Sequence, residues 1–394
     1  MKNIELFSLV FVFFLAFSCE NKMEIDKKTV FRYNETKNIN SLDPIFAKDL
    51  SSIKVVNQLF NGLVDLNTKL EVIPSIAKSW NISSDGKVYT FILRNDVFFH
   101  PHPDLSERNV RAKDFQYSFE RLIDPNNASP GKWVFDKVDN FKAINDTIFK
   151  IVLHQPYNPF LGILTMKYCS VVPKEVIESA NTEFRSSPIG TGPFKFKRWE
   201  ENIKLVLRKN DEYFEKDEKG VKIPYLEAVS ITFLPEKQSE FLQLIKDEID
   251  MISGIDSSFK DEILEINGDI KNKYKQSIKI LKGPFLNTEY LAFFMNSTKE
   301  EVQSPLIRKA INIGFDKNKM IRFLRNGIGK PANGGIIPIG LQGFKINQNN
   351  IYDPEKAKEY VDEYKKITNE IPNLKLTTSP EYVVFCEFIQ KELE

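Results

Sequence analysis

Apolar and polar positions alternate along some short segments of the chain and recur at helical spacing in others. Residues 88–94 are rich in β-branched and aromatic side chains and follow an Asp85-Gly86 turn, which predicts the second strand of a hairpin. Residues 112–123 place Phe115, Phe119 and Leu122 on one face and stop at Asp124-Pro125, which predicts an amphipathic helix. Two further strands are predicted at 204–208 and 228–233.

Helical spacing dominates the second half of the chain. We predict helices at 240–250, 305–313, 317–325 and 354–367. The last of these has Asp353 as its N-cap and Pro354 as its first residue. Its apolar face consists of Ala357, Tyr360, Val361 and Tyr364. The sequence therefore predicts a mixed α/β protein of more than one domain, without short internal repeats.

The last segments of the sequence predict one more strand and one more helix. The strand is expected at 374–378 and the helix at 381–393, with Val384, Phe385, Phe388 and Ile389 on its apolar side. A strand followed by a crossover helix normally leads to a second parallel strand, and no residues follow to form it. We expect a truncated version, or an incomplete record, of a longer protein.

The first residues have the features of an export signal. Lys2 is followed by an apolar run at residues 6–17, and the small residue Ser18 precedes Cys19. A twelve-residue helix spans about 18 Å, short of the roughly 30 Å bilayer core, so a signal segment fits better than a membrane span. The Ser18-Cys19 pair resembles a bacterial lipobox, which predicts lipidation of Cys19; ordinary signal cleavage is the alternative. Residues 20–28 are polar and predict a tether.

Composition narrows the classes of function. The 394 residues carry 55 Lys and Arg against 54 Asp and Glu, and 42% of them are hydrophobic, which is typical of an ordinary folded protein. The balanced charge disfavours a nucleic-acid partner. Three Cys cannot form a disulfide scaffold, and three His leave few ways to build a metal site, so we expect no metal and no cofactor.

Motifs for common chemistry are missing, which disfavours an enzyme. The sequence has no nucleophile elbow, zinc-protease helix or phosphate-binding loop. His100 and His102 offer two imidazoles, but a solvated loop is the more economical interpretation. His154 is expected to be a hydrogen-bonded structural residue rather than a general base. Cys169 and Cys386 are expected to be buried thiols, and the sequence leaves open whether they pair.

A series of longer motifs resembles one family. The motifs occur at residues 41–44, 58–64, 76–80, 85–94, 97–100, 112–119, 188–195, 248–250, 292–297, 306–310 and 353–357. In this order they resemble the extracellular solute-binding proteins of family 5, which are the oligopeptide- and dipeptide-binding components of ABC transporters. Most of these residues also suit turns and core positions, so each motif is expected to be mainly scaffold.

The resemblance implies a fold and a domain plan. The fold is an α/β, class II periplasmic binding protein-like structure with two lobes, an inserted domain and an incomplete second lobe. The implied plan is a signal peptide at 1–18, a lipid-anchored tether at 19–28, lobe I at 29–60 and 175–288, an inserted domain at 61–174 and lobe II at 289–394. Ligand is expected to bind between the lobes, and closure is expected to be recognised by the transporter.

The resemblance also implies ligand contacts. In the first lobe and inserted domain these are Lys48, Asp49, Leu50, Trp133, Met166, Tyr168, Thr191 and Gly192. Lys48 is expected to face a ligand carboxylate or phosphate, whereas Thr191 and Gly192 also suit a turn. From the second lobe, Asn296 is expected to bond the ligand main chain. Phe294 stands where some relatives have a carboxylate, which predicts a less polar pocket.

Three functions remain open from the sequence. The first is a lipid-anchored, monomeric receptor that captures peptides for ABC permease subunits at the cell envelope. The second keeps the fold with another solute, such as a nickel chelate, haem, an oligosaccharide or a cell-wall peptide. The third is a truncated surface lipoprotein that serves as an interaction or adhesion module, because the late Asp motif that pairs with a peptide's N-terminus in relatives is missing from this sequence.

Overall fold

The computed structural model describes residues 29–180, 183–256, 259–283, 285–347, 350–379 and 382–394. The predicted signal segment, Cys19 and the tether lie outside these residues. The chain divides into two compact units, Met1–Ser253 and Gly254–Glu394, which we call unit 1 and unit 2. Unit 2 begins ahead of the start of lobe II expected at residue 289, and the domain boundaries stay predictions.

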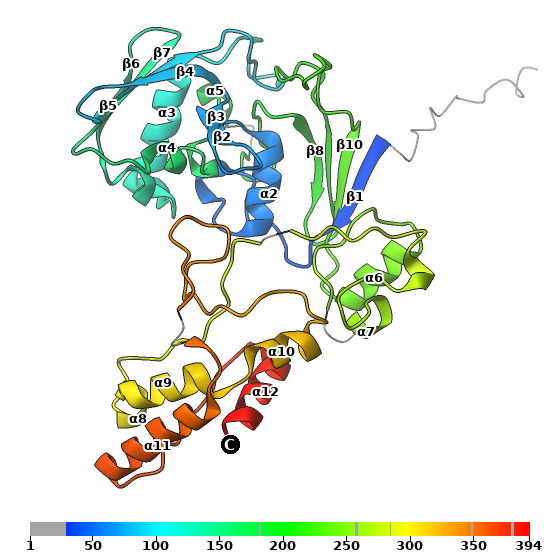
Figure 1. Ribbon diagram of the computed structural model, residues 1–394. Coiled ribbons are helices and arrows are strands. Elements are labelled where there is room, and N and C mark those ends of the chain that lie inside the picture. Colours follow the sequence, from blue (N-terminus) through cyan, green and yellow to red (C-terminus); the bar gives the residue numbers. More distant parts are fainter. Residues whose placement is uncertain (1–28, 181–182, 257–258, 284, 348–349, 380–381) are drawn as a thin grey trace, which may run out of the picture. The chain divides into compact units, whose positions relative to one another are not determined.

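Unit 1 is built on two four-stranded sheets (Figure 1). Its strands are β1 (Val30–Asn34), β2 (Val64–Leu66), β3 (Val72–Pro74), β4 (Ala77–Ile82), β5 (Val88–Leu93), β6 (Val138–Ala143), β7 (Ile148–Leu153), β8 (Phe194–Glu200), β9 (Lys204–Lys209) and β10 (Ala228–Thr232). Its helices and 3-10 turns are η2 (Pro44–Phe46), α2 (Leu50–Leu59), α3 (Ala112–Ile123), η3 (Pro125–Asn127), η4 (Lys132–Phe135), α4 (Phe160–Ile163), η5 (Lys167–Cys169), α5 (Lys174–Ile177) and α6 (Lys237–Ile245).

The two sheets of unit 1 differ in strand direction. One has the order β1-β10-β9-β8, with β1 parallel to β10 and the other pairs antiparallel. The other has the order β4-β5-β7-β6 and is antiparallel throughout. The strands predicted at 88–94, 204–208 and 228–233 are confirmed as β5, β9 and β10. A short hairpin of β2 and β3 stands apart from both sheets.

The apolar pattern explains how α3 packs. Every second residue of β5 and β7 is buried, as expected for strands with one covered face. The predicted helix is confirmed as α3, and its Phe119 packs edge-on against Phe141 of β6 and Phe149 of β7, with ring centroids 5.7 and 5.5 Å apart. Figure 1 shows α3 against this sheet. Phe119 and Phe149 are fully buried, so they lie at the centre of the main core.

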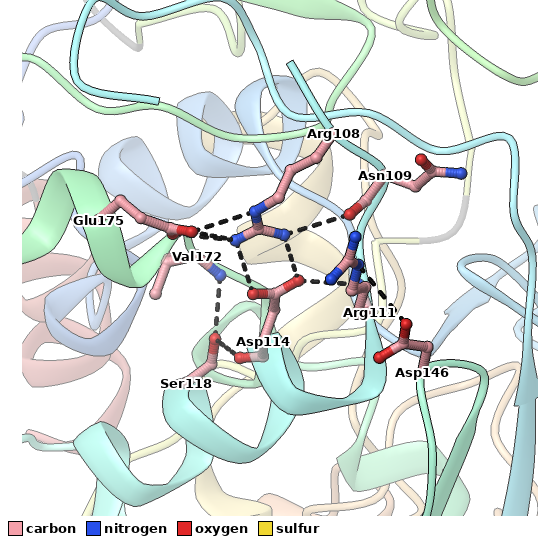
Figure 2. A network of polar contacts seen from close by, with 8 residues as sticks. All are labelled: Arg108, Asn109, Arg111, Asp114, Ser118, Asp146, Val172 and Glu175. Carbon is pink, nitrogen blue, oxygen red and sulfur yellow. Dashed lines mark hydrogen bonds and ion pairs between the residues drawn. The ribbon is translucent and has the colours of Figure 1, made fainter. Parts of the chain in front are cut away.

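A partly buried arginine, Arg108, fastens the start of α3 to its surroundings (Figure 2). Arg108 donates to both carboxylate oxygens of Asp114, at 2.8 and 2.9 Å, and to Glu175 of α5 at 2.9 Å. The carboxylate of Asp114 also accepts the Arg111 N–H at 2.8 Å, which caps the helix. The two carboxylates raise the pKa of Arg108 against the opposing effect of burial, so the guanidinium stays charged.

Unit 2 contains helices and extended segments. Its helices and 3-10 turn are α7 (Lys260–Ile263), η6 (Asn272–Tyr274), α8 (Glu300–Gln303), α9 (Pro305–Gly314), α10 (Lys317–Leu324), α11 (Pro354–Thr368) and α12 (Val383–Leu393). A small core joins α9 and α11 through Ala310, Ile313 and Ala357. The predicted helices at 305–313, 317–325 and 354–367 are confirmed, and Asp353 caps α11 by accepting the Lys356 N–H at 3.0 Å.

Three local predictions need correction. The strand predicted at 374–378 is wrong, because the described residues offer it no neighbouring strand to pair with. The helix predicted at 240–250 runs from Lys237 to Ile245 and ends before Asp247, which has a positive φ of 58°. The loop expected to solvate His100 buries it instead, to 2% exposure. The helix predicted at 381–393 is observed as α12, from Val383.

Candidate functional site

The predicted contacts of the first lobe begin at the start of α2. Asp49 is the N-cap of this helix and accepts the Ser52 N–H and Ser52 hydroxyl, both at 2.9 Å. Asn40 donates to the same carboxylate at 3.1 Å. Partial burial opposes ionisation, but these donors outweigh it and lower the pKa of Asp49. Asp49 therefore holds the helix start in place, while Lys48 and Leu50 on either side of it are exposed.

Lys48 borders an open pocket of about 410 Å³. The pocket is lined by Asn40, Ser41, Phe46, Lys48, Ala128, Pro130 and Arg185. The loop that contributes Ala128 and Pro130 is tied to the segment just before Lys48, because the Ser129 hydroxyl donates to the Ile45 carbonyl at 2.6 Å. We call this pocket, with its seven lining residues, the Lys48 pocket.

Tyr168 and Trp133 lie beside the same loop. Gly131, next to the pocket residue Pro130, packs on the Tyr168 ring so closely that a Cβ atom there would stand 2.3 Å from the ring. Burial raises the pKa of Tyr168, and the charge of Asp49 raises it further, which places this phenol within the field of the α2 N-cap. Trp133 follows in η4 and keeps 49% of its surface exposed. Lys48, Asp49, Leu50, Trp133 and Tyr168 thus belong to one region.

Met166, Thr191 and Gly192 have a different setting. Met166 is partly buried against the main core, at the start of η5. Thr191 is 1% exposed, and its hydroxyl donates to Asn61 at 3.0 Å. The Gly192 N–H donates to the Leu59 carbonyl at 2.9 Å, and a Cβ at Gly192 would lie 2.5 Å from the Gln58 carbonyl oxygen. Thr191 and Gly192 therefore pack at the C-terminal end of α2, away from Asp49 at its start.

His100 explains why the 190–192 segment is so firmly held. Its Nδ1 accepts the Gly190 N–H at 3.3 Å, and its Nε2 lies 3.0 Å from the Gly192 carbonyl oxygen. Complete burial lowers the pKa of His100 to about 4, so the ring is neutral at pH 7 and Nε2 is the donor. Both nitrogens are engaged with backbone groups, which gives His100 a structural role.

The remaining predicted residues are placed as follows. Phe294 and Asn296 lie in a non-helical segment of unit 2, where both are exposed and Phe294 is 73% accessible. His154 is a surface residue whose Nδ1 lies 3.3 Å from Asp139. Cys169 and Cys386 are free thiols; Cys169 is buried, which raises its pKa to about 12, and Cys386 is half-buried.

Arg185 is the charged pocket residue that the sequence did not predict as a ligand contact. Its Nε donates to the Asn40 carbonyl at 3.0 Å, its guanidinium stacks over Trp199, and its Nη1 pairs with Glu201 at 2.7 Å. Arg185 lies outside regular secondary structure, and its neighbours in the pocket are far away in sequence, so no local pattern marks it.

Two structural absences concern the part of the chain that is described. Within those residues, no group of three or more His, Cys, Asp or Glu side chains is arranged to hold a metal ion. Among the same residues, every helix is too short or too polar to cross a bilayer.

Comparisons with known proteins find similarity to solute-binding proteins. The family model described as "Bacterial extracellular solute-binding proteins, family 5 Middle" matches residues 71–394. The chain is 28% identical over 334 residues to the dipeptide-binding protein of Escherichia coli (strain K12), which covers 80% of this chain and 58% of that protein. It is also 28% identical over 325 residues to heme-binding protein A of Haemophilus influenzae, covering 78% of this chain and 56% of the relative.

A solved structure gives the same result. The periplasmic binding protein DppA from Helicobacter pylori, in complex with the peptide STSA, is similar with a TM-score of 0.76 and 28% identity, covering 92% of this chain and 71% of that one. This likeness confirms the predicted α/β fold of the periplasmic binding protein type. The three proteins named here are binding proteins. The chain spans somewhat more than half the length of the two curated relatives.

Proposed function

The chain belongs to the bacterial extracellular solute-binding proteins of family 5, and from this premise we propose that it captures peptides outside the cytoplasm for an ABC importer. Family 5 proteins bind solutes in the periplasm or outside the cell. Peptide as the cargo is supported by the 28% identity to the dipeptide-binding protein and to the peptide complex of DppA. Delivery to permease subunits follows from the family and needs no chemistry in the protein itself.

The Lys48 pocket region carries the proposal. It offers a peptide an exposed cation at Lys48, an exposed apolar side chain at Leu50 and a half-exposed indole at Trp133. The helix cap at Asp49 and the close packing of Gly131 hold the surrounding frame. A frame fixed by buried contacts suits binding, because little conformational entropy is lost when the ligand docks. Broad cargo acceptance would follow from contacts to the peptide main chain, which every peptide shares.

The proposal is tested by native mass spectrometry of the purified full chain with a library of di- to pentapeptides. We expect retained peptides of mixed sequence, and at least tenfold weaker retention after Trp133→Ala, because aromatic side chains often dominate binding. The matched control is Trp80→Ala, since Trp80 is a partly buried strand residue outside the pocket region. Retention of haem with no peptide would contradict peptide capture and favour the cargo of heme-binding protein A.

Membrane anchoring is a separate part of the proposal. A lipid on Cys19 would keep the receptor close to its permease, since a lipid-modified N-terminus partitions into the bilayer. Cys19→Ser is expected to move the protein from the membrane fraction to the soluble fraction and to abolish incorporation of radiolabelled palmitate. Cys386→Ser, which removes a half-buried free thiol, is the control and should stay with the membrane. Unchanged fractionation of Cys19→Ser would refute the anchor.

A further inference from the structure

The Lys48 pocket has more hydrogen-bond donors than acceptors. Its lining includes two cationic side chains, Lys48 and Arg185, and no carboxylate. Among the residues that the structure describes, Lys48 forms no ion pair and Arg185 has only Glu201 as a charged partner. The backbone carbonyl of Asn40 accepts from Arg185, and the side-chain amide of Asn40 donates to Asp49, so both groups are already engaged. A lining of this kind suits an oxygen-rich anion.

The carboxylates near the pocket are already engaged by other groups. Asp43 is buried and pairs with Arg121, whose Nη1 donates to it at 2.9 Å. Both carboxylate oxygens of Asp49 accept hydrogen bonds, from Ser52 and Asn40. Glu201 meets Arg185 through an exposed contact, and an exposed pair of this kind contributes little. Hence neither Asp43 nor Asp49 is available to neutralise Lys48.

Two further features add polar recognition and shape. The Ser41 hydroxyl oxygen accepts the Asp43 N–H at 3.1 Å, and its own proton has no acceptor among the described residues. Phe46, Ala128 and Pro130 supply the apolar part of the lining. A volume of about 410 Å³ accommodates a short acidic side chain together with water. The pocket thus combines two cations, one hydroxyl donor and an apolar wall.

We propose that Lys48 and Arg185 form a subsite for a side-chain carboxylate of the captured peptide, so that the protein prefers acidic peptides. This inference rests on the proposed function and adds the class of peptide. Lys48 approaches the carboxylate as a mobile point charge, whereas Arg185 is held in place by the Asn40 carbonyl and the Trp199 ring. A charge-assisted contact of this kind corresponds to about tenfold or more in affinity.

The test compares two panels of tripeptides by calorimetry on the full chain. One panel carries Glu at each position of tri-alanine in turn, and the other carries Gln at the same positions, so the terminal charges are equal. We expect one Glu position to bind about tenfold more tightly than its Gln counterpart, with a preference that weakens as salt is added. The preference should fall below twofold in a Lys48→Gln and Arg185→Gln double variant.

The control is a Lys69→Gln and Arg198→Gln double variant, which removes the same charge from exposed residues outside the pocket and should keep the preference. Tryptophan fluorescence on heating checks that both double variants fold, and Lys48→Gln alone replaces the first if it does not. Inorganic phosphate should compete with the favoured Glu peptide more strongly than with its Gln counterpart.

The outcomes separate the inference from the proposed function. Equal binding of Glu and Gln peptides, or a preference that survives in the pocket variant, overturns the carboxylate subsite and leaves peptide capture standing. Binding of phosphate without any Glu preference overturns the assignment to a peptide side chain. Failure of every peptide to bind overturns peptide capture and the subsite together.

Discussion

Unit 1 and unit 2 bury their apolar side chains to different extents, and phenylalanine shows the contrast most simply. In unit 1, Phe60, Phe91, Phe115, Phe119, Phe149 and Phe160 are fully buried. In unit 2, Phe285, Phe294 and Phe323 are each more than half exposed. Strands in unit 1 bring distant apolar residues together in sheets, whereas the described residues of unit 2 pack mainly through pairs of neighbouring helices. A contact in unit 1 should therefore matter more for stability than the same contact in unit 2.

The largest difference is expected for matched phenylalanine truncations. Phe119→Ala should lower the free energy of unfolding by about 3–5 kcal/mol, because it leaves a cavity among packed rings. Phe294→Ala should change it by less than about 0.5 kcal/mol, because the side chain is exposed. Urea unfolding measures both, with tryptophan fluorescence for unit 1, which holds all three tryptophans, and far-ultraviolet circular dichroism for unit 2. Equal losses would contradict the contrast.

A second pair of variants compares ion pairs. Arg108→Met leaves Asp114 buried without its partner and should cost about 3–5 kcal/mol in unit 1. Arg325→Met removes the more exposed pair with Glu289 in unit 2 and should cost about 1 kcal/mol or less. The same urea experiment applies. A small effect of Arg108→Met would mean that Asp114 finds another donor, and the network in Figure 2 would then not fasten α3.

The third prediction concerns pH and is confined to unit 1. Folding lowers the pKa of His100 from 6.5 to about 4. As the pH falls, the His100 ring is therefore protonated at a higher pH in the unfolded chain than in the folded chain. This contribution to stability is complete above pH 6.5 and is lost as the pH falls toward 4, by about 3 kcal/mol in total. Urea unfolding at pH 7 and pH 4.5 should show the loss, and it should be smaller in His100→Gln. If His100→Gln loses as much stability between pH 7 and pH 4.5 as the wild type, the loss belongs to other titrating groups. His154→Gln is the control and should lose as much as the wild type.

Helix caps give the smallest expected difference. Asp49→Ala in unit 1 removes a carboxylate that accepts three hydrogen bonds, whereas Asp353→Ala in unit 2 removes one that accepts the Lys356 N–H. We expect losses of about 2 kcal/mol and about 1 kcal/mol in the free energy of unfolding. Asp49→Asn and Asp353→Asn should recover most of each loss, because Asn also caps helices. An Asp353 variant that costs more than the Asp49 variant would reverse the order.

The sequence predicted local structure well where periodicity and caps act within a few residues. The helix at 112–123 and the cap at Asp353 were found because their signals are local. The strand predicted at 374–378 was wrong because a strand depends on a partner that composition cannot supply. The helix predicted at 240–250 extended too far, because the sequence carries no local stop signal where the helix ends at Ile245.

Some residues of the candidate site were also predictable from the sequence, and others were not. Lys48, Asp49 and Leu50 lie a few residues after the Asp43-Pro44 motif, so the sequence pointed to them through the family resemblance. Their part in ligand binding stays a prediction. Arg185 lies in a loop more than a hundred residues after Lys48 and is held at the pocket by its bond to the Asn40 backbone carbonyl. Residues that meet only in the folded chain leave no spacing pattern, so Arg185 was found from the structure alone.

The central claim is that a peptide binds to unit 1 beside Trp133, and tryptophan fluorescence tests it most directly. Trp133 is half-exposed, whereas Trp80 and Trp199 are partly buried against the core. Titration of the full chain with a peptide identified from the library should shift the emission in a saturable way, and Trp133→Phe should remove that shift while the unfolding transition stays in place. A saturable shift that persists in Trp133→Phe, or bound peptide that leaves the emission of the wild type unchanged, would contradict the account.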